Sequence, residues 1–395
     1  MTEDGFAKRS VEVISGLQEE DGGILATGKD DAYPFVYPRD AAIMTMALNL
    51  HGLHENSMAF YDYIAKVQRT NGEVFQRYNA GHPFVSQTGE ADVTPIVIQG
   101  IYDTFLTSND VTFLERMWNV TTEGVSFIGS MIDPTVGLLH TARSVHEYNG
   151  LEEGFEVWAN SAAVKGLLDA SRIASALHRQ DSAEAWMSRG RSLWKAMTEK
   201  LYDPMTGVFL KNLRRDGSKV TAPDVAQVSP FYFGLTNDRS SLERTLAHLR
   251  RTLWNEGVGG FNRFRDFEVV PDWHWYTGGT RASWPLFTLW MAKLYRRLGD
   301  TDSAGRCMHF VRSAATARMD IPEKVAPLEG YQEWKSNETQ YNERVQRGAA
   351  KAEASSVSIP GYVAWACPLG WSHAEYLLFE KNDGPEDAAL LSDGP

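Results

Sequence analysis

The sequence predicts an all-α protein, an (α/α)6 barrel whose long loops form an active-site pocket at one end. Three observations lead to this prediction. Apolar residues recur with a helical period, as in the series Ile43, Met46, Ala47 and Leu50. The two-residue alternation that is typical of strands is scarce. The connections between the expected helices alternate between short and long, as they would if helices paired as hairpins around a ring.

About twelve helices are expected from this periodicity, and several of them begin at a proline. Pro38, Pro95 and Pro285 each stand near a first helical turn, where a missing N–H costs little. Residues 207–220 are expected to form one short hairpin. The expected helices cover residues 4–17, 39–52, 55–68, 94–107, 110–131, 157–178, 181–201, 224–236, 239–252, 284–298, 301–316 and 368–380.

The long connections are the informative part of the chain. They cover residues 19–38, 69–92, 132–156, 253–283 and 317–367. Long loops inside a compact domain are usually functional, so we expect the site at the end of the barrel where they gather. Because no Pro/Gly/Ser-rich linker interrupts the chain, we expect one all-α domain over residues 1–395.

The composition narrows the class of protein. Hydrophobic residues make up 43% of the 395 residues and charged residues 23%, which is typical of a globular domain. The formal net charge of −12 argues against a nucleic acid partner, because phosphate binding rests on clustered Lys and Arg. The chain has no stretch that could cross a membrane and no visible signal peptide, so we expect a cytoplasmic location. The oligomeric state, monomer or small homo-oligomer, is left open.

No cofactor is expected. The two cysteines, Cys307 and Cys367, do not lie in a metal or redox spacing, and Cys307 is expected to be a buried free thiol on a helix. No His, Asp and Glu cluster has the spacing of metal ligands, so no metal site is expected either. Calcium held by loop carbonyls is left open.

The long loops share one composition, in which carboxylates and Arg stand beside aromatic residues. Carboxylates and Arg form hydrogen bonds with hydroxyl groups, and aromatic faces stack on the C–H faces of a sugar ring. Glycoside hydrolysis needs two carboxyl groups, one protonated and one ionised, and composition alone does not select the two. The residues concerned are Tyr33, Phe35, Tyr37, Arg39, Asp40, Phe75, Tyr78, His82, Phe84, Gln87, Glu90, Asp92, Glu147, Glu152, Glu153, Glu156, Trp158, Arg263, Arg265, Asp266, Trp273, His274, Trp275, Trp284 and Glu323.

With these residues in place, the chain resembles glycoside hydrolase family 15, the glucoamylase family, over most of its length. Tyr37-Pro38-Arg39-Asp40 is similar to the family's first signature, which ends in Trp-Pro/Thr-Arg-Asp, with Tyr where Trp is usual. The resemblance implies that Arg39 and Asp40 hold the non-reducing glucose through its 4- and 6-hydroxyls. It also implies that Tyr33 lies beside the catalytic water.

The family's second signature is Trp-Glu-Glu, whose first Glu is the general acid. Its best match is Leu151-Glu152-Glu153, with Leu in place of Trp and a shorter stretch before the next Gly-aromatic pair. The resemblance favours Glu152 as the acid and places Glu153 near the +1 sugar. The choice among Glu152, Glu153 and Glu156 stays open.

The family's last signature contains the general base. IPEKV (321–325) resembles the family's Leu-Pro-Glu-Gln segment, which implies that Glu323 deprotonates the attacking water. Arg263 is similar to a family Arg that contacts the glucose, and Trp158 and Trp275 are expected among the substrate-binding residues.

The string PLGWSHAEY (368–376) is close to a C-terminal segment of the family and is the most specific string in the chain. We expect Trp371, Ser372 and His373 to be mainly structural, with Glu375 on the same helix.

The resemblance implies an inverting exo-α-glucosidase of the glucan 1,4/1,6-α-glucosidase type. Relative to other family members, we expect a single catalytic barrel over 1–395, without a separate β-sandwich or starch-binding domain. Glu152 would protonate the leaving oxygen and Glu323 would activate water, which releases β-glucose from small α-glucosides. Isomaltose and short α-1,6 isomalto-oligosaccharides are the expected substrates, and a trehalase or an α-1,4-specific glucoamylase on the same fold is the nearest alternative. A sugar phosphorylase and a non-catalytic sugar-binding barrel are the alternatives from other classes, and a Glu at 323 argues against both.

Overall fold

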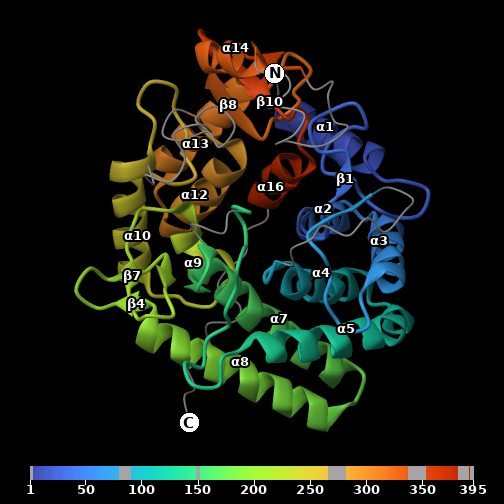
Figure 1. Ribbon diagram of the computed structural model, residues 1–395. Coiled ribbons are helices and arrows are strands. Elements are labelled where there is room, and N and C mark those ends of the chain that lie inside the picture. Colours follow the sequence, from blue (N-terminus) through green and yellow to red (C-terminus); the bar gives the residue numbers. More distant parts are fainter. Residues whose placement is uncertain are drawn as a thin grey trace.

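The computed structural model describes residues 3–79, 90–147, 152–265, 282–336 and 353–380, together with Leu391. Helices dominate these ranges and surround a common centre (Figure 1). They are α1 (Glu3–Gly16), α2 (Pro38–Leu50), α3 (His54–Val67), α4 (Val93–Ser108), α5 (Val111–Met131), α7 (Val157–Ala176), α8 (Gln180–Lys200), α9 (Ser229–Tyr232), α10 (Arg239–Leu253), α12 (Pro285–Leu298), α13 (Thr301–Ala314), α14 (Leu328–Ser336) and α16 (Gly370–Glu380), with a 3-10 turn η1 (Val225–Val228) before α9.

The helices form two concentric rings, which confirms the predicted (α/α)6 barrel. The inner ring contains α2, α4, α7, α9, α12 and α16, and α16 packs against α2 to close the circle (Figure 1). The outer helices α3, α5, α8 and α13 each pack against the inner helix that precedes them, while α1 packs against α16 and α10 against α12.

Burial distinguishes the two rings. On the inner helix α7 most side chains are buried, and Gly166 approaches α4 so closely that an added Cβ would lie 2.9 Å from the Cα of Pro95. On the outer helix α10 only one stripe is buried, which includes Leu242, Leu246 and Leu249. An inner helix is covered by neighbours on most sides, whereas an outer helix keeps a solvated face.

The connections give the barrel its polarity. Short turns lead from each inner helix to its outer partner, and long segments lead from each outer helix to the next inner helix. Because successive helices run antiparallel, the N-terminal ends of the inner helices lie at one end of the barrel. The long segments therefore meet at that end. The segment 201–224, before η1, belongs with them, although the sequence did not single it out.

Short antiparallel strands stiffen this end of the barrel. In one sheet β3 (Phe155–Glu156) pairs with β6 (Asn212–Leu213), which pairs with β7 (Lys219–Val220). The expected hairpin within 207–220 is thus confirmed in its second half. The remaining pairs are β1 (Phe35–Val36) with β2 (Tyr78–Asn79), β4 (Tyr202–Asp203) with β5 (Val208–Phe209), and β8 (Lys324–Pro327) with β10 (Tyr362–Trp365), which also pairs with β9 (Ser355–Ser356).

Two predicted elements need correction. The helix expected over 224–236 is split into η1 and the single turn α9, because Asp224 caps η1 and Pro230 begins a new turn at α9. The helix α14 was not expected, and it lies inside the last long connection.

Three further findings concern the described residues. Cys307 is a buried free thiol, as expected. Across the described ranges, none of the helices has the length and apolarity that crossing a membrane requires. No group of three or more His, Cys, Asp and Glu side chains in the same ranges is arranged to hold a metal ion.

Candidate active site

Arg39, in the first turn of α2, is the centre of a cluster of carboxylates. Its guanidinium donates from Nε to Asp40 Oδ1 (3.1 Å), from Nη1 to Glu90 Oε2 (3.0 Å) and from Nη2 to Glu147 Oε1 (2.9 Å). Asp92 Oδ2 lies 3.6 Å from Nη1. Arg39 is only 3% exposed, so these ion pairs are shielded from water. Four carboxylates from three separate segments therefore share one guanidinium.

The carboxyl groups around Arg39 bind protons more tightly than usual. Burial raises the pKa of Asp40 to about 7 and the pKa of Asp92 to about 6, although Arg39 opposes both shifts. Burial and then Glu147 raise the pKa of Glu90 well above its ordinary value. One positive charge does not compensate for several buried carboxylates. We therefore expect this cluster to hold at least one proton near neutral pH.

Glu323 stands directly before β8 and is held at both its backbone and its side chain. Its N–H donates to the carbonyls of Trp365 (3.2 Å) and Ala366 (3.0 Å). Its carboxylate accepts a hydrogen bond from the hydroxyl of Tyr33, with 3.1 Å between Tyr33 Oη and Glu323 Oε2. The structure thus joins the expected base and the tyrosine expected beside the water.

The charges around Glu323 act in opposite directions. Burial raises the pKa of Glu323, whereas Lys324, Arg263 and the Tyr33 hydrogen bond lower it, and Glu147 raises it. Arg263 and Lys324 both face the ring of Trp284, at 4.6 and 5.4 Å from its centroid. Burial is the largest effect, so the pKa of Glu323 is raised overall, and burial also lowers the pKa of Lys324 to about 7. Arg263 and Lys324 limit the rise and so favour the ionised carboxylate that a general base needs.

The C-terminal helix α16 supports the segment that carries Glu323. The Oγ of Ser372 donates to the carbonyl of Pro322 (2.8 Å), and His373 Nε2 accepts from the N–H of Ile321 (2.9 Å). Burial lowers the pKa of His373 to about 3, so the imidazole is neutral and can accept this bond. The structural role expected for these two residues agrees with their contacts.

Trp371 and Glu375 complete the support. The Arg39 guanidinium lies 5.1 Å above the centroid of the Trp371 ring, and Trp371 Nε1 donates to Glu375 Oε1 (3.0 Å). Tyr232 and Trp290 also donate to this oxygen. The buried carboxylate therefore orients the aromatic surface under Arg39.

Glu147 is the third-loop acid that reaches the Arg39 cluster. Its side chain is 31% exposed, and its carboxyl group is close enough to raise the pKa of Glu323 and of Asp40. Its backbone has a φ of +60°, in the left-handed region that few non-glycine residues adopt. Glu147 therefore combines contact with the site and access to solvent, as a proton donor requires.

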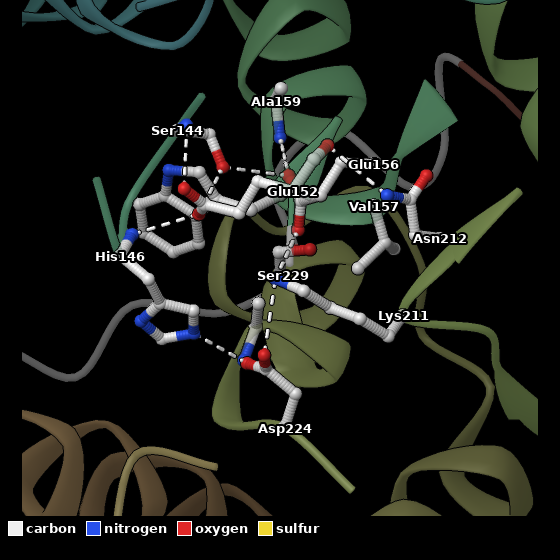
Figure 2. A network of polar contacts seen from close by, with 12 residues as sticks. Ser144, His146, Glu152, Glu156, Val157, Ala159, Lys211, Asn212, Asp224 and Ser229 are labelled. Atoms are coloured by element: carbon white, nitrogen blue, oxygen red, sulfur yellow. Dashed lines mark hydrogen bonds and ion pairs between the residues drawn. The ribbon is translucent and has the colours of Figure 1, made fainter. Parts of the chain in front are cut away.

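Glu152, the favoured general acid from the sequence, does not have these properties, and this prediction is corrected. Its carboxylate is fully buried and accepts three hydrogen bonds, from the N–H and Oγ of Ser144 and the N–H of His146 (Figure 2). Lys211, His146 and these bonds outweigh burial and lower its pKa. A carboxylate that stays ionised and has no exposed surface is a poor proton donor.

Of the two other acids that the sequence left open, Glu156 is also unsuited. Glu156 is fully buried, where it caps α7 through the N–H of Ala159 and pairs with Lys211. Glu153 is exposed, and its pairing with the expected +1 sugar stays a prediction. The sequence did contain a signal for the role of Glu156, because it stands just before an expected helix, a position that is typical of a helix cap.

The aromatic residues that were expected to bind the substrate lie in different surroundings. Trp158 is fully buried, its ring stacks on Trp290 at 4.6 Å, and its Nε1 donates to Asp92 (2.8 Å). It therefore belongs to the core and cannot stack on a sugar, which corrects that prediction. Tyr37 is 6% exposed and packs edge-on against Tyr33. Trp275 lies outside the described residues, as do the loop residues Asp266, Trp273 and His274.

Glu90 and Glu147 are the candidate functional residues that the sequence did not select, although both belong to its loop acids. Nothing in their local sequence distinguishes them from neighbouring acids. Their importance comes from Arg39, which lies 51 and 108 positions away along the chain.

Comparisons with known proteins agree with a carbohydrate site. Residues 133–344, more than half of the chain, match the model of the mannosylglycerate hydrolase MGH1-like glycoside hydrolase domain. An uncharacterized glycosyl hydrolase of Methanocaldococcus jannaschii is 23% identical over 297 residues, which are 74% of this chain and 45% of that protein. The chain thus spans less than half the length of this relative.

Two solved structures share the fold. A bacterial glucoamylase complexed with acarbose has a TM-score of 0.70 and 16% identity, over 98% of this chain and 55% of its own. A glycosidase variant in complex with glucose has a TM-score of 0.68 and 19% identity, over 98% of this chain and 96% of its own. At these identities the likeness concerns the barrel and not the substrate.

Proposed function

Because this chain belongs to the mannosylglycerate hydrolase MGH1-like glycoside hydrolase family, we propose that it is an inverting exo-α-glycosidase. Glu147 is the general acid and Glu323 is the general base. The observation that carries the proposal is the meeting of these two carboxyl groups, from separate loops, at the Arg39–Asp40 pair. Both act at the end of the barrel where the inner helices begin.

In this mechanism Glu147 protonates the glycosidic oxygen as the bond to the sugar breaks. Glu147 belongs to the cluster around Arg39, in which four carboxyl groups share one guanidinium. The exposed part of the Glu147 side chain gives a leaving group access to it. A positioned acid of this kind contributes roughly 10²–10⁴-fold to the rate.

Glu323 takes a proton from the water that attacks the opposite face of the sugar. Tyr33 occupies Oε2 of the carboxylate and thereby orients the group. Lys324 and Arg263 favour its ionised form. An inverting enzyme needs about 6.5–9.5 Å between the two carboxyl groups, to leave room for the water.

The sugar ring binds between these groups through Arg39 and Asp40. Asp40 is adjacent to Arg39 on the first turn of α2, so the helix fixes both side chains relative to the barrel. The substrates we propose are small α-glucosides, with isomaltose and short α-1,6 isomalto-oligosaccharides first, in line with the resemblance to family 15.

A second candidate substrate is a glycoside whose aglycone carries a carboxylate. The name of the family refers to mannosylglycerate, which has such a group. Arg263 is half-buried, and its Nε has no hydrogen-bond partner among the residues that the structure describes. A guanidinium in that state suits a carboxylate as well as a sugar hydroxyl.

Proton NMR of a fresh digest tests the proposal. Isomaltose, maltose, trehalose and mannosylglycerate are compared, with the Glu323→Gln variant as the inactive control. The anomeric signal of the first sugar released should be the β form, because inversion at an α-linked carbon gives β. Early α-sugar contradicts the assignment of Glu147 and Glu323, and turnover of mannosylglycerate alone selects the second candidate. Release from none of the four substrates contradicts the proposed function.

A further inference from the structure

A buried ionic network, shown in Figure 2, contacts the backbone of the segment 144–147, which carries the candidate general acid. Its ionisable members are each at most 4% exposed, although none of them belongs to the Arg39 cluster. They are His146, Glu152, Glu156, Lys211 and Asp224.

Lys211 joins the starts of two inner elements. Its Nζ lies 2.9 Å from Glu156 Oε1 and 3.1 Å from Asp224 Oδ2. Glu156 caps α7, and Asp224 caps η1 by accepting from the N–H of Ala226 (2.8 Å). The network is therefore anchored to the N-terminal ends of α7 and η1 in the interior of the barrel.

Glu152 connects this framework to the segment 144–147, which ends in Glu147. Its Oε2 accepts from the N–H of Ser144 (2.9 Å), and its Oε1 accepts from the N–H of His146 (2.8 Å) and from Ser144 Oγ (2.8 Å). The segment is thus held through two backbone N–H groups, one and three residues before Glu147.

The hydroxyl of Ser144 lies between the two glutamates of the network. Its Oγ lies 2.8 Å from Glu152 and 3.0 Å from Glu156, but a hydroxyl has only one hydrogen to donate. The pKa of Glu156 is raised by burial and that of Glu152 is lowered by Lys211 and the other donors. Glu152 is therefore the stronger acceptor of the two, and the Ser144 hydroxyl donates to it as the third of its hydrogen bonds.

A second connection passes through His146. Its Nε2 donates to Asp224 Oδ1 (2.7 Å), and its ring lies edge-on to Phe264 and Phe287, at 5.3 and 5.8 Å. Phe264 follows Arg263, whose carbonyl accepts from the N–H of Val225. The same network thus supports the segments that carry Glu147 and Arg263.

Stability does not account for such a network by itself. Burial of ions carries a desolvation cost, and apolar residues of similar volume are often as stable or more so. An apolar side chain could not accept the N–H groups of Ser144 and His146. The left-handed backbone at Glu147 also costs free energy and persists only where the surroundings determine it.

We propose that Glu152 is a positioning residue for the general acid, and that Asp224 and His146 assist it. It fixes the backbone of residues 144–147 so that the Glu147 carboxyl group points toward Arg39 and the leaving oxygen. The catalytic part of this inference rests on the proposed function, whereas the fixing of the segment does not.

The test is Glu152→Gln, which preserves the shape of the side chain but replaces one accepting oxygen by a donating NH2. One of the three donors then loses its acceptor, and the segment moves. We expect kcat to fall on the order of 10²-fold, as for a small displacement of a catalytic group, with a smaller change in KM. The alkaline limb of the kcat/KM profile persists, because Glu147 still supplies the proton.

Hydrogen exchange of the amides of residues 140–147 provides a readout without substrate. It should be faster in Glu152→Gln than in the wild type. The matched control is Asp169→Asn, a buried carboxylate on α7 that pairs with Lys165 and Arg172. It should lower the free energy of unfolding but leave kcat, the pH profile and the exchange of residues 140–147 unchanged.

Two outcomes overturn the inference: unchanged exchange in Glu152→Gln, or loss of the alkaline limb, which would make Glu152 itself the acid. If the wild type hydrolyses no glycoside, the proposed function fails, and the exchange experiment still decides whether Glu152 holds the segment. If Glu152→Gln does not fold, His146→Phe replaces it, since Phe retains the ring contacts and removes the bond to Asp224. Because the backbone N–H of residue 146 still donates to Glu152 in that variant, faster exchange supports the part of the inference assigned to His146 and Asp224, and unchanged exchange overturns that part.

Discussion

At the scale of single residues, the candidate site is defined by an excess of carboxylates over cations, since four carboxylates surround the single guanidinium of Arg39. Arg39 contacts Asp40, Glu90 and Glu147 at 2.9–3.1 Å, and the pKa of Asp40 and Glu90 is raised mainly by burial. Carboxyl groups in this state are good proton stores. Glu152 differs, because the three hydrogen-bond donors that face its carboxylate stabilise the ionised form.

Paired amide variants separate the roles of Glu147 and Glu90. Glu147→Gln should lower kcat by about 10²–10⁴-fold, because the amide cannot donate an acidic proton. Glu90→Gln should retain kcat within about 3-fold near neutral pH, because Gln imitates the protonated acid that its raised pKa indicates. Steady-state kinetics of both variants checks this. If Glu90→Gln were as inactive as Glu147→Gln, Glu90 would be the acid.

At the scale of elements, the site is built on the N-terminal ends of the inner helices. Asp40 lies in the first turn of α2, Asp92 is the N-cap of α4, Glu156 is the N-cap of α7 and Asp224 caps η1. Helix N-termini carry partial positive charge and free N–H groups. This placement explains how so many carboxylates can be buried together.

The contact between α16 and the segment before β8 leads to a second prediction. Ser372→Ala leaves the buried carbonyl of Pro322 without its donor, which should cost about 1–3 kcal/mol of stability. Because Pro322 precedes Glu323, kcat should fall as well. Ser171→Ala, which removes a similar buried bond to the carbonyl of Ala183, is the control and should affect only stability. Equal kcat in the two variants would show that α16 does not position the base.

At the scale of the whole molecule, the buried acids determine how stability depends on pH. The pKa of Asp31, Asp40 and Asp92 rises from 3.8 to about 6, 7 and 6, with burial as the largest cause. The folded protein therefore binds more protons than the unfolded chain in this range, and stability falls as pH rises. His373, whose pKa is lowered from 6.5 to about 3, acts in the opposite direction below pH 6.5.

More acids have a raised pKa than histidines have a lowered one, so chemical denaturation should give a higher free energy of unfolding at about pH 5 than at about pH 7. The acids are Asp31, Asp40, Glu90, Asp92, Glu156, Glu323 and Glu375, and the histidines are His140, His146, His248 and His373. Each fully shifted group contributes about 1.4 kcal/mol per pH unit. Asp40→Asn imitates the protonated acid and should make the pH dependence shallower. Stability that increases from pH 5 to pH 7 would contradict this account of the buried cluster.

The sequence by itself determined the helical class, the alternation of short and long connections, and the pool of acids from which the site is drawn. Helical periodicity is a local property, and so are the prolines and the long loops. The association of Tyr33, Arg39, Asp40 and Glu323 with one site also came from local signatures. The contacts at Arg39 and the bond between Tyr33 and Glu323 agree with it.

Only the tertiary structure decided which third-loop acid faces the site. Glu147 and Glu152 are five positions apart, but one contacts Arg39 and the other contacts Ser144 and His146. The tertiary structure likewise decided that Trp158 lies in the core, where its ring stacks on Trp290. Closure of the barrel brings together residues that are distant along the chain, and their burial, charge and hydrogen-bond partners follow from that closure rather than from their neighbours in sequence.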